Sequence, residues 1–154
     1  MTEDRLLYHM KLITNAFIEA KITRMCIYSS ALLIERLNFE GINSKLVVGY
    51  LQTQTQEHEE FCRHVWVESN GFIYDSMVNV LKEIWKDSAF KYQHFHTLPP
   101  VPIIASDKEL EYGINLYQTN PFMFWSEFDA ITDVIFNTKF KPTINKLRDY
   151  FLNL

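Results

Sequence analysis

The sequence predicts an α+β fold in which helices pack on an antiparallel sheet, and three observations support this prediction. Apolar residues recur at helical spacing in the first third of the chain and near its end, short runs rich in β-branched and aromatic residues fill the middle, and Asn70-Gly71 separates two of those runs. The Asn-Gly pair is the strongest short-range signal of a β-hairpin. Helices, then strands, then helices is an order typical of α+β proteins.

The first third of the chain predicts two helices joined by a short turn. The second covers Cys26 to Phe39, with Thr23 available as its N-cap and Gly41 as its left-handed terminator. The first covers Asp4 to Lys21, where apolar residues four and three positions apart form one stripe: Leu6, Met10, Ile13, Phe17 and Ala20.

The middle of the chain predicts three strands, over Ser44–Leu51, Phe61–Glu68 and Phe72–Asp75. The polar stretch Gln52–Glu60 has no apolar periodicity, so it predicts an exposed loop between the first two strands. Asn70-Gly71 predicts a two-residue turn between the second and third strands.

The remainder of the chain predicts an extended connector and further helices. Leu98 to Pro102 lacks amide donors at three positions and is expected to be stiff and extended. The expected helices cover Val78–Trp85, Asp107–Tyr117, Pro121–Phe136 with Asn120 as its cap, and Pro142–Leu152. We expect a single domain, with a core over residues 1–97 and a helical C-terminal extension over residues 98–154 packed on it.

Composition excludes several classes of protein. The 154 residues are 47% hydrophobic and carry a net charge of -4, which indicates a globular protein that does not bind nucleic acid by neutralising phosphates. No apolar run approaches the roughly 18–20 residues that span a bilayer, and the acidic N-terminus lacks the layout of a secretion signal. With only two cysteines, we expect a cytoplasmic protein with reduced thiols and no nucleic-acid or membrane partner; its oligomeric state is left open.

Cys26 is the first candidate for chemistry, because it lies in the first turn of the second expected helix. Unpaired amides and the positive end of the helix dipole favour a thiolate there, and the same amides can stabilise an oxyanion. The structural alternative is that Cys26 is a small buried apolar residue, as most cysteines are.

The expected hairpin brings a histidine and an aspartate together. With a two-residue loop at Asn70-Gly71, Trp66 faces Asp75, and His64 lies two residues from Trp66 on the same face. Diagonal positions of this kind are about 7–8 Å apart, within reach of an imidazole and a carboxylate. Asp75 would then hold one nitrogen of His64 while the other meets a nucleophile. A loop one residue longer would put Asp75 on the opposite face, and a surface His–Asp pair without catalytic function is the alternative.

These residues stand in an order that resembles the transglutaminase-like superfamily of papain-like folds. The resemblance is carried by Arg24 to Gly49, in which a cysteine opens a helix and Gly41-Ile42 precedes an apolar strand that ends near a glycine, then by His64-Val-Trp-Val-Glu68 and by Tyr74-Asp75. It covers roughly residues 20–77, about half of the chain. The resemblance implies Cys26 as nucleophile, His64 as base and Asp75 as the acid that orients the base.

The resemblance implies a cysteine hydrolase or acyl transferase that acts on an amide or thioester bond through an acyl-enzyme, without a cofactor. The substrate would be a peptide, a protein or a small acyl compound, and the backbone amide of Cys26 is the one oxyanion donor that we name. Ile27 stands where transglutaminases proper carry tryptophan, and the Cys-x-Glu-x-Asn run of arylamine acetyltransferases is absent, so the subfamily is left open. The alternative function is an inactive module of this fold that binds a peptide or partner protein.

Other chemistry-bearing residues receive structural interpretations. His58, Cys62 and His64 form a His-x3-Cys-x-His run, but no second ligand pair at finger-like spacing follows, so no metal site is expected. Cys62 shares the strand face of His64, where it could line a cleft, although packing is the favoured role. His94 and His96 are expected to pack in a loop, with completion of a metal site as the alternative. The aromatic residues of the C-terminal part are expected in the core, with a substrate wall or partner surface as the alternative.

Overall fold

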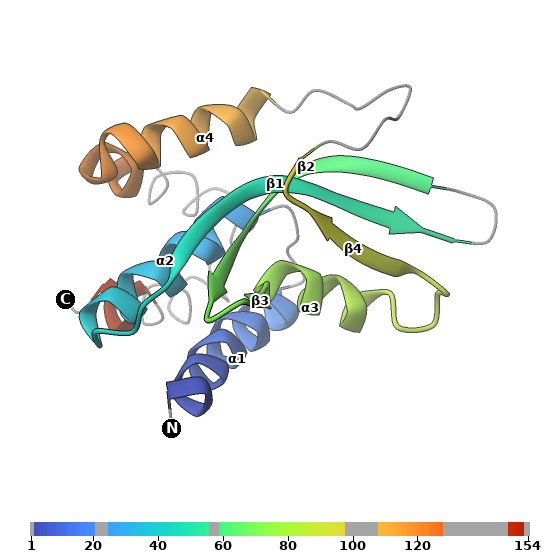
Figure 1. Cartoon of the computed structure of the whole chain (residues 1–154), viewed down its shortest axis with the longest axis horizontal. Helices are drawn as coiled ribbons and strands as arrows, with labels where there is room; N and C mark the ends of the chain where they lie inside the picture. Colours follow the sequence, from blue (N-terminus) through green and yellow to red (C-terminus); the bar gives the residue numbers. More distant parts are fainter. Residues whose placement is uncertain (1, 21–24, 56–58, 98–107, 128–147, 153–154) are drawn as a thin grey trace.

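The computed structural model describes residues 2–20, 25–55, 59–97, 108–127 and 148–152, and these residues have the predicted α+β architecture (Figure 1). A four-stranded antiparallel sheet has the strand order β3-β2-β1-β4. Helices α1, α2 and α3 contact one another, and α2 also packs against β1 and β2. Helix α2, whose first residue is Cys26, therefore packs on the sheet.

The two N-terminal helices match the prediction closely. Helix α1 spans Thr2–Ala20 and α2 spans Cys26–Phe39, and the buried residues of both form the core together with those of the sheet. After α2, Gly41 has φ 71°, and the amides of Gly41 and Ile42 donate to the carbonyls of Asn38 and Leu37. This is a Schellman motif, in which only glycine takes the left-handed position without strain. The predicted cap is wrong, because the N-cap of α2 is Met25 and Thr23 lies outside the described residues.

Strands β1 (Lys45–Gln54) and β2 (Glu59–Ser69) form a long curved hairpin that extends away from the helices (Figure 1). The exposed loop predicted over residues 52–60 is therefore wrong at both ends, because Gln52 to Gln54 belong to β1 and Glu59 and Glu60 to β2. Polar residues can continue a strand where the ladder itself satisfies the backbone and one face meets solvent. Residues 56–58 of the predicted loop lie outside the described part.

The turn between β2 and β3 (Phe72–Tyr74) has the predicted length. Asn70 and Gly71 have φ 53° and 81°, as the two central residues of a type I′ turn require. The register also follows the prediction, with Ser69 opposite Phe72 and Val67 opposite Tyr74. The ladder ends there, because Asp75 becomes the N-cap of α3 (Ser76–Ile84), a helix predicted slightly later in the chain.

Strand β4 (Lys91–Phe95) is the element that the sequence analysis missed. It pairs antiparallel with the outer half of β1, where Leu51 lies opposite His94 and Tyr50 opposite Phe95. The expectation that His94 and its neighbours lie in a loop is therefore wrong. The absence of a side chain at Gly49 lets β4 and Trp66 approach β1 closely. A Cβ there would overlap the carbonyl oxygen of Phe95 and lie 2.5 Å from Cη2 of Trp66.

The C-terminal part is helical where the structure describes it. Helix α4 spans Lys108–Thr119, and residues 121–127 and 148–152 are also helical. Asn120 caps the helix over residues 121–127, as predicted, since its Oδ1 accepts a hydrogen bond from the amide of Met123. Tyr117 Oη donates to Glu35 Oε1 on α2 at 2.7 Å, which connects α4 to the core. The predicted connector 98–102, residues 128–136 and residues 142–147 lie outside the described part.

None of the described helices combines the length and apolar character needed to cross a membrane.

Candidate active site

Cys26 occupies the first position of α2, and its side chain lies in the interior with only 6% of the residue exposed. The N-cap residue Met25 makes no side-chain hydrogen bond to the first turn, and that turn carries no acidic residue. The amides of a helix's first turn have no partner within the helix, and they carry the positive end of its dipole. The local environment of the Cys26 sulfur is therefore one that favours an anion.

His64 and Asp75 make the contact that the hairpin geometry predicts. Nε2 of His64 lies 2.6 Å from Oδ2 of Asp75, and both side chains are almost fully buried. His64 comes from the middle of β2, whereas Asp75 stands just beyond β3 at the start of α3. Oδ1 of Asp75 accepts from the amide of Val78 at 3.0 Å, so the same carboxylate caps α3 and holds the imidazole.

The charge of Asp75 determines which protons the site carries. Burial raises the pKa of this carboxyl, but attraction to His64 and hydrogen bonds from His64, His94 and Val78 outweigh it and hold the pKa below its ordinary value. An ionised carboxylate only accepts hydrogen bonds, so Nε2 of His64 must carry a proton. Nδ1 is then the ring nitrogen left for another partner.

Cys26 interacts with the same imidazole. Burial lowers the pKa of His64, but the charge and hydrogen bond of Asp75, together with a hydrogen bond and Coulomb attraction from Cys26, raise it well above the ordinary value. The imidazole thus interacts with both the carboxylate and the cysteine. Such an arrangement can hold a thiolate–imidazolium pair and can move a proton between sulfur and ring.

A hydrogen bond next to His64 fixes α2 against β2. Oγ of Ser30, one turn along the helix from Cys26, donates to the carbonyl oxygen of Val65 at 3.2 Å. Both residues are buried, and Val65 follows His64 directly in β2. The bond therefore sets the position of the helix start relative to the histidine. The sequence analysis did not identify Ser30, because nothing in its local pattern distinguishes this serine from other helical serines.

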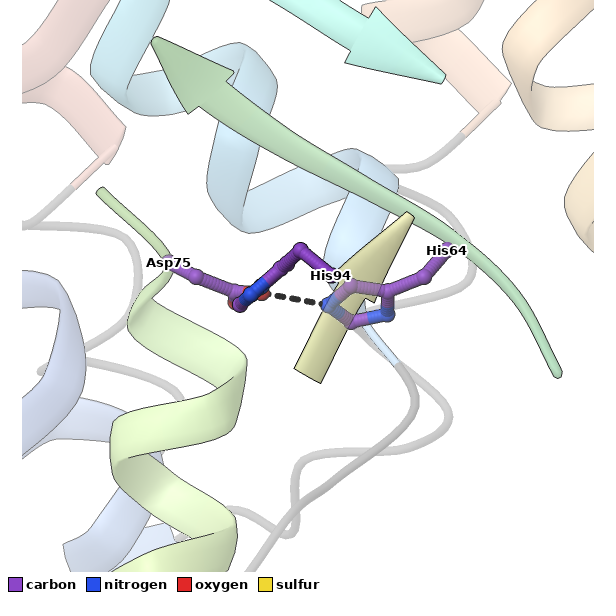
Figure 2. Close-up of side chains that lie close together, drawn as sticks. All are labelled: His64, Asp75 and His94. Atoms are coloured by element: carbon purple, nitrogen blue, oxygen red, sulfur yellow. Dashed lines mark hydrogen bonds and ion pairs between the residues drawn. The ribbon is translucent and has the colours of Figure 1, made fainter. Parts of the chain in front are cut away.

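His94 is a site residue that the sequence analysis did not identify. Its Nε2 lies 2.7 Å from Oδ2 of Asp75, the same oxygen that His64 contacts. Figure 2 shows the three side chains converging from β2, from the start of α3 and from β4. Register explains this, because Gly49 lies opposite His64 and Leu51 opposite His94, and residues two apart in β1 share a face.

Trp66 packs against both histidines. Its ring stacks on His64 with 6.1 Å between centroids and meets His94 edge-on at 4.8 Å, while its Nε1 donates to Glu68. The indole is fully buried and shares a strand face with His64. It keeps water from this side of the imidazoles and limits the orientations of their rings.

The residues His64, Asp75 and His94 are also of types that bind metal ions, and one ligand atom from each lies within 4.8 Å of the others. Their distances are those of hydrogen bonds. Ligand atoms about 2.0–2.1 Å from a tetrahedral zinc ion are about 3.3 Å apart, whereas each histidine nitrogen lies 2.6 or 2.7 Å from the shared oxygen. Of the His-x3-Cys-x-His run, at which no metal site is expected, Cys62 is exposed and His58 lies outside the described residues.

The other predicted candidates are not brought to this site. Cys62 is exposed rather than packed in the core, and neither cysteine, both of which the structure describes, forms a disulfide. His96 lies beyond β4 and is largely exposed, with Nε2 2.6 Å from Glu68. A hollow of about 350 Å³ between the sheet and α4 is lined by Val48 and Arg63, which lie on the sheet face opposite His64.

Comparisons with models of protein families, with curated proteins and with solved structures find no match to this chain.

Proposed function

We propose that the protein is a cysteine hydrolase or acyl transferase of transglutaminase-like type, in which Cys26, His64 and Asp75 form the catalytic triad. One observation carries the proposal: the buried His64 is hydrogen-bonded to Asp75, and both that carboxylate and Cys26 raise its pKa. The three residues come from a helix start, a strand and a second helix start. A structural ion pair needs no cysteine in this position, whereas nucleophilic catalysis needs all three groups in this order.

The reaction would begin with attack by the Cys26 sulfur on the carbonyl carbon of an amide or thioester. A C–S bond forms while the carbonyl π electrons move onto oxygen, and His64 holds the proton that the thiol has given up. His64 then delivers this proton to the departing amine or thiol as the bond to it breaks. Asp75 keeps the ring in place and stabilises its cationic form throughout.

The acyl-enzyme would be resolved by the reverse sequence. Water or an amine attacks the thioester carbonyl, His64 takes the proton of the attacking group, and the C–S bond breaks to regenerate Cys26. With water the products are those of hydrolysis, and with an amine the acyl group is transferred. Both routes use the same three side chains and need no cofactor.

The start of α2 would stabilise the oxyanion of both tetrahedral intermediates. The backbone amide of Cys26 is the donor that we assign, because Met25 makes no capping bond to the first turn of the helix and that turn carries no acidic residue. Donors fixed by a helix cost no reorganisation when the charge develops on the substrate oxygen.

The test compares the two cysteines within one protein. Iodoacetamide is reacted for short times at pH 6, and mass spectrometry of the peptides gives separate rate constants for Cys26 and Cys62. A buried thiol without activation reacts more slowly than an exposed one, so we expect the opposite order for Cys26, and we expect His64→Ala to abolish the difference. Slower alkylation of Cys26 than of Cys62, unchanged in His64→Ala, would refute the proposal.

A non-catalytic module that binds a peptide or partner protein is the second candidate, and exposed apolar residues in the C-terminal part favour it. Phe122 is 80% exposed, and Tyr112 and Met123 are exposed as well. An electrophilic cysteine probe discriminates between the two functions. Labelling of Cys26 that requires His64 and the native fold indicates an enzyme, whereas equal labelling of native and denatured protein indicates a binding module.

A further inference from the structure

We infer that His94 is a positioning residue of the triad: by donating Nε2–H to Oδ2 of Asp75, it fixes the carboxylate in the orientation that aligns His64 with Cys26. The inference rests on the proposed function, since it concerns the same site. It adds a fourth residue that neither the linear motif nor the predicted hairpin contains.

The hydrogen bonds of Asp75 show what His94 contributes. The amide of Val78 holds Oδ1, and a single bond of this kind leaves the carboxylate free to rotate about its Cβ–Cγ bond. His64 is not an independent restraint on this rotation, because its ring is the group that the carboxylate must itself align. His94 supplies an independent second donor at Oδ2, from a strand whose backbone is held by β1. The carboxylate plane is then fixed at both oxygens.

The location of His94 supports a specific role. Only 13% of its side chain is exposed, and its ring meets the edge of Trp66, which itself stacks on His64. The indole thus sets the distance between the two histidine rings, whose centroids are 6.0 Å apart. Gly49 makes this assembly possible, because a side chain there would overlap both Trp66 and the backbone of β4.

Loss of the donor has a defined consequence. With His94 removed, Oδ2 has one partner, the carboxylate rotates, and the distance between Asp75 and His64 lengthens. The stabilisation of the His64 cation weakens, and the ring leaves its alignment with the sulfur. Reactivity of Cys26 is expected to fall about tenfold, which corresponds to about 1.4 kcal/mol and lies at the upper end of the range for one hydrogen bond.

The experiment compares His94→Phe, which keeps a ring without a donor, with His94→Gln, which keeps an N–H donor. Both are made in a Cys62→Ser background, so that Cys26 is the only thiol. We measure the rate of iodoacetamide alkylation at pH 6 and thermal unfolding by circular dichroism. Alkylation is expected to slow about tenfold in His94→Phe and less than threefold in His94→Gln, with both variants folded. Unchanged alkylation in His94→Phe, or equal losses in both variants, would overturn the inference.

A second readout separates this inference from the proposed function. In a Cys26→Ser background, ¹⁵N NMR of the histidine rings reports the titration midpoint of His64 without any reaction at sulfur. His94→Phe is expected to move this midpoint to lower pH, and His94→Gln to leave it near the parent value. A downward shift supports the positioning role even if Cys26 proves unreactive. An unchanged or upward midpoint in folded His94→Phe, or one equivalent of zinc that survives dialysis and is lost in His94→Phe, would overturn it.

Discussion

Replacing Asp75 by asparagine is the most informative single change, because the structure dictates how the new side chain can bond. Three N–H groups donate to the two carboxylate oxygens: the amide of Val78 to Oδ1, and Nε2 of both His64 and His94 to Oδ2. Asparagine has one oxygen and an NH2 group that only donates. At least one of the three donors must therefore face another donor.

The two orientations of the new side chain differ in cost. With the carbonyl at the Oδ2 position, both histidines keep an acceptor and α3 loses its cap, at about 1 kcal/mol. With the carbonyl at the Oδ1 position, two buried N–H groups lose their acceptor, at about 1–3 kcal/mol each. We therefore expect the first orientation. A loss of about 1 kcal/mol lowers the melting temperature by roughly 2–4 °C for a domain of this size.

Reactivity falls for a different reason, namely the loss of negative charge. A hydrogen bond to a charged group contributes about 1.5–3 kcal/mol and one between neutral groups about 1 kcal/mol, so the His64 cation loses about 1 kcal/mol or more. This corresponds to a decrease in Cys26 alkylation of about fivefold to tenfold or more at pH 6. The direction follows from the pKa of His64, which the charge of Asp75 helps to raise.

The assay is iodoacetamide alkylation of Cys26 in a Cys62→Ser background, with thermal unfolding measured in parallel. Asp87→Asn is the matched control, because it removes the same charge from an exposed aspartate just beyond α3. We expect the control to match the parent in both measurements. If Asp75→Asn alkylated as fast as the parent, the claim that the carboxylate activates the imidazole would be refuted.

Three further predictions concern how the site is held in place. Gly49→Ala is expected to displace Trp66 or β4, because the added Cβ would lie 2.5 Å from the indole. Near-ultraviolet circular dichroism and the melting temperature test this prediction. A variant that matches the parent in both measurements would contradict it. Ser30→Ala removes the hydrogen bond to Val65. It is expected to lower the free energy of unfolding, measured with urea, by about 1 kcal/mol and to slow the alkylation of Cys26. Unchanged alkylation would mean that this bond does not position the helix start. The pKa of Glu40 is lowered to about 2, first by its bond from Arg5, so its stabilising contribution is present above about pH 4.5 and is lost as pH falls towards 2. Glu40→Gln should flatten stability against pH in that window, measured by urea unfolding, and a slope equal to that of the parent would contradict the assignment.

Much of the geometry of the candidate site could be predicted from local signals in the sequence. A two-residue Asn-Gly turn fixes the register of the hairpin, and the register fixes which side chains share a face, so the contact of His64 with Asp75 was expected from the turn length. Asp75 itself leaves the ladder and caps α3, which the turn does not predict. The helix start at Cys26 was visible because helical periodicity begins there. These signals lie within about ten residues of the features they determine.

The parts that were missed depend on contacts between distant segments. Strand β4 is five residues long and mostly polar, and it exists because the outer half of β1 offers an unpaired edge. The role of His94 follows from that pairing, some 40 residues away along the chain. The prediction ended β1 at Leu51, three residues too early, for the same reason. The polar residues Gln52 to Gln54 show no apolar alternation in the sequence, and they belong to the strand because β2 and β4 pair with them on both sides.

The charge balance of the proposed site explains why Cys26 and Asp75 both lie at the N-terminal end of a helix. A thiolate at Cys26, an imidazolium at His64 and a carboxylate at Asp75 sum to one negative charge in the interior, where an uncompensated charge is costly. Arg63 is adjacent in sequence but lies on the opposite face of β2 and pairs with Glu111. Each anionic group instead lies at the start of a helix, and neither α2 nor α3 has an acidic residue in its first turn. The positive ends of the two helix dipoles thus lie at the two anionic groups and contribute to stabilising their charge.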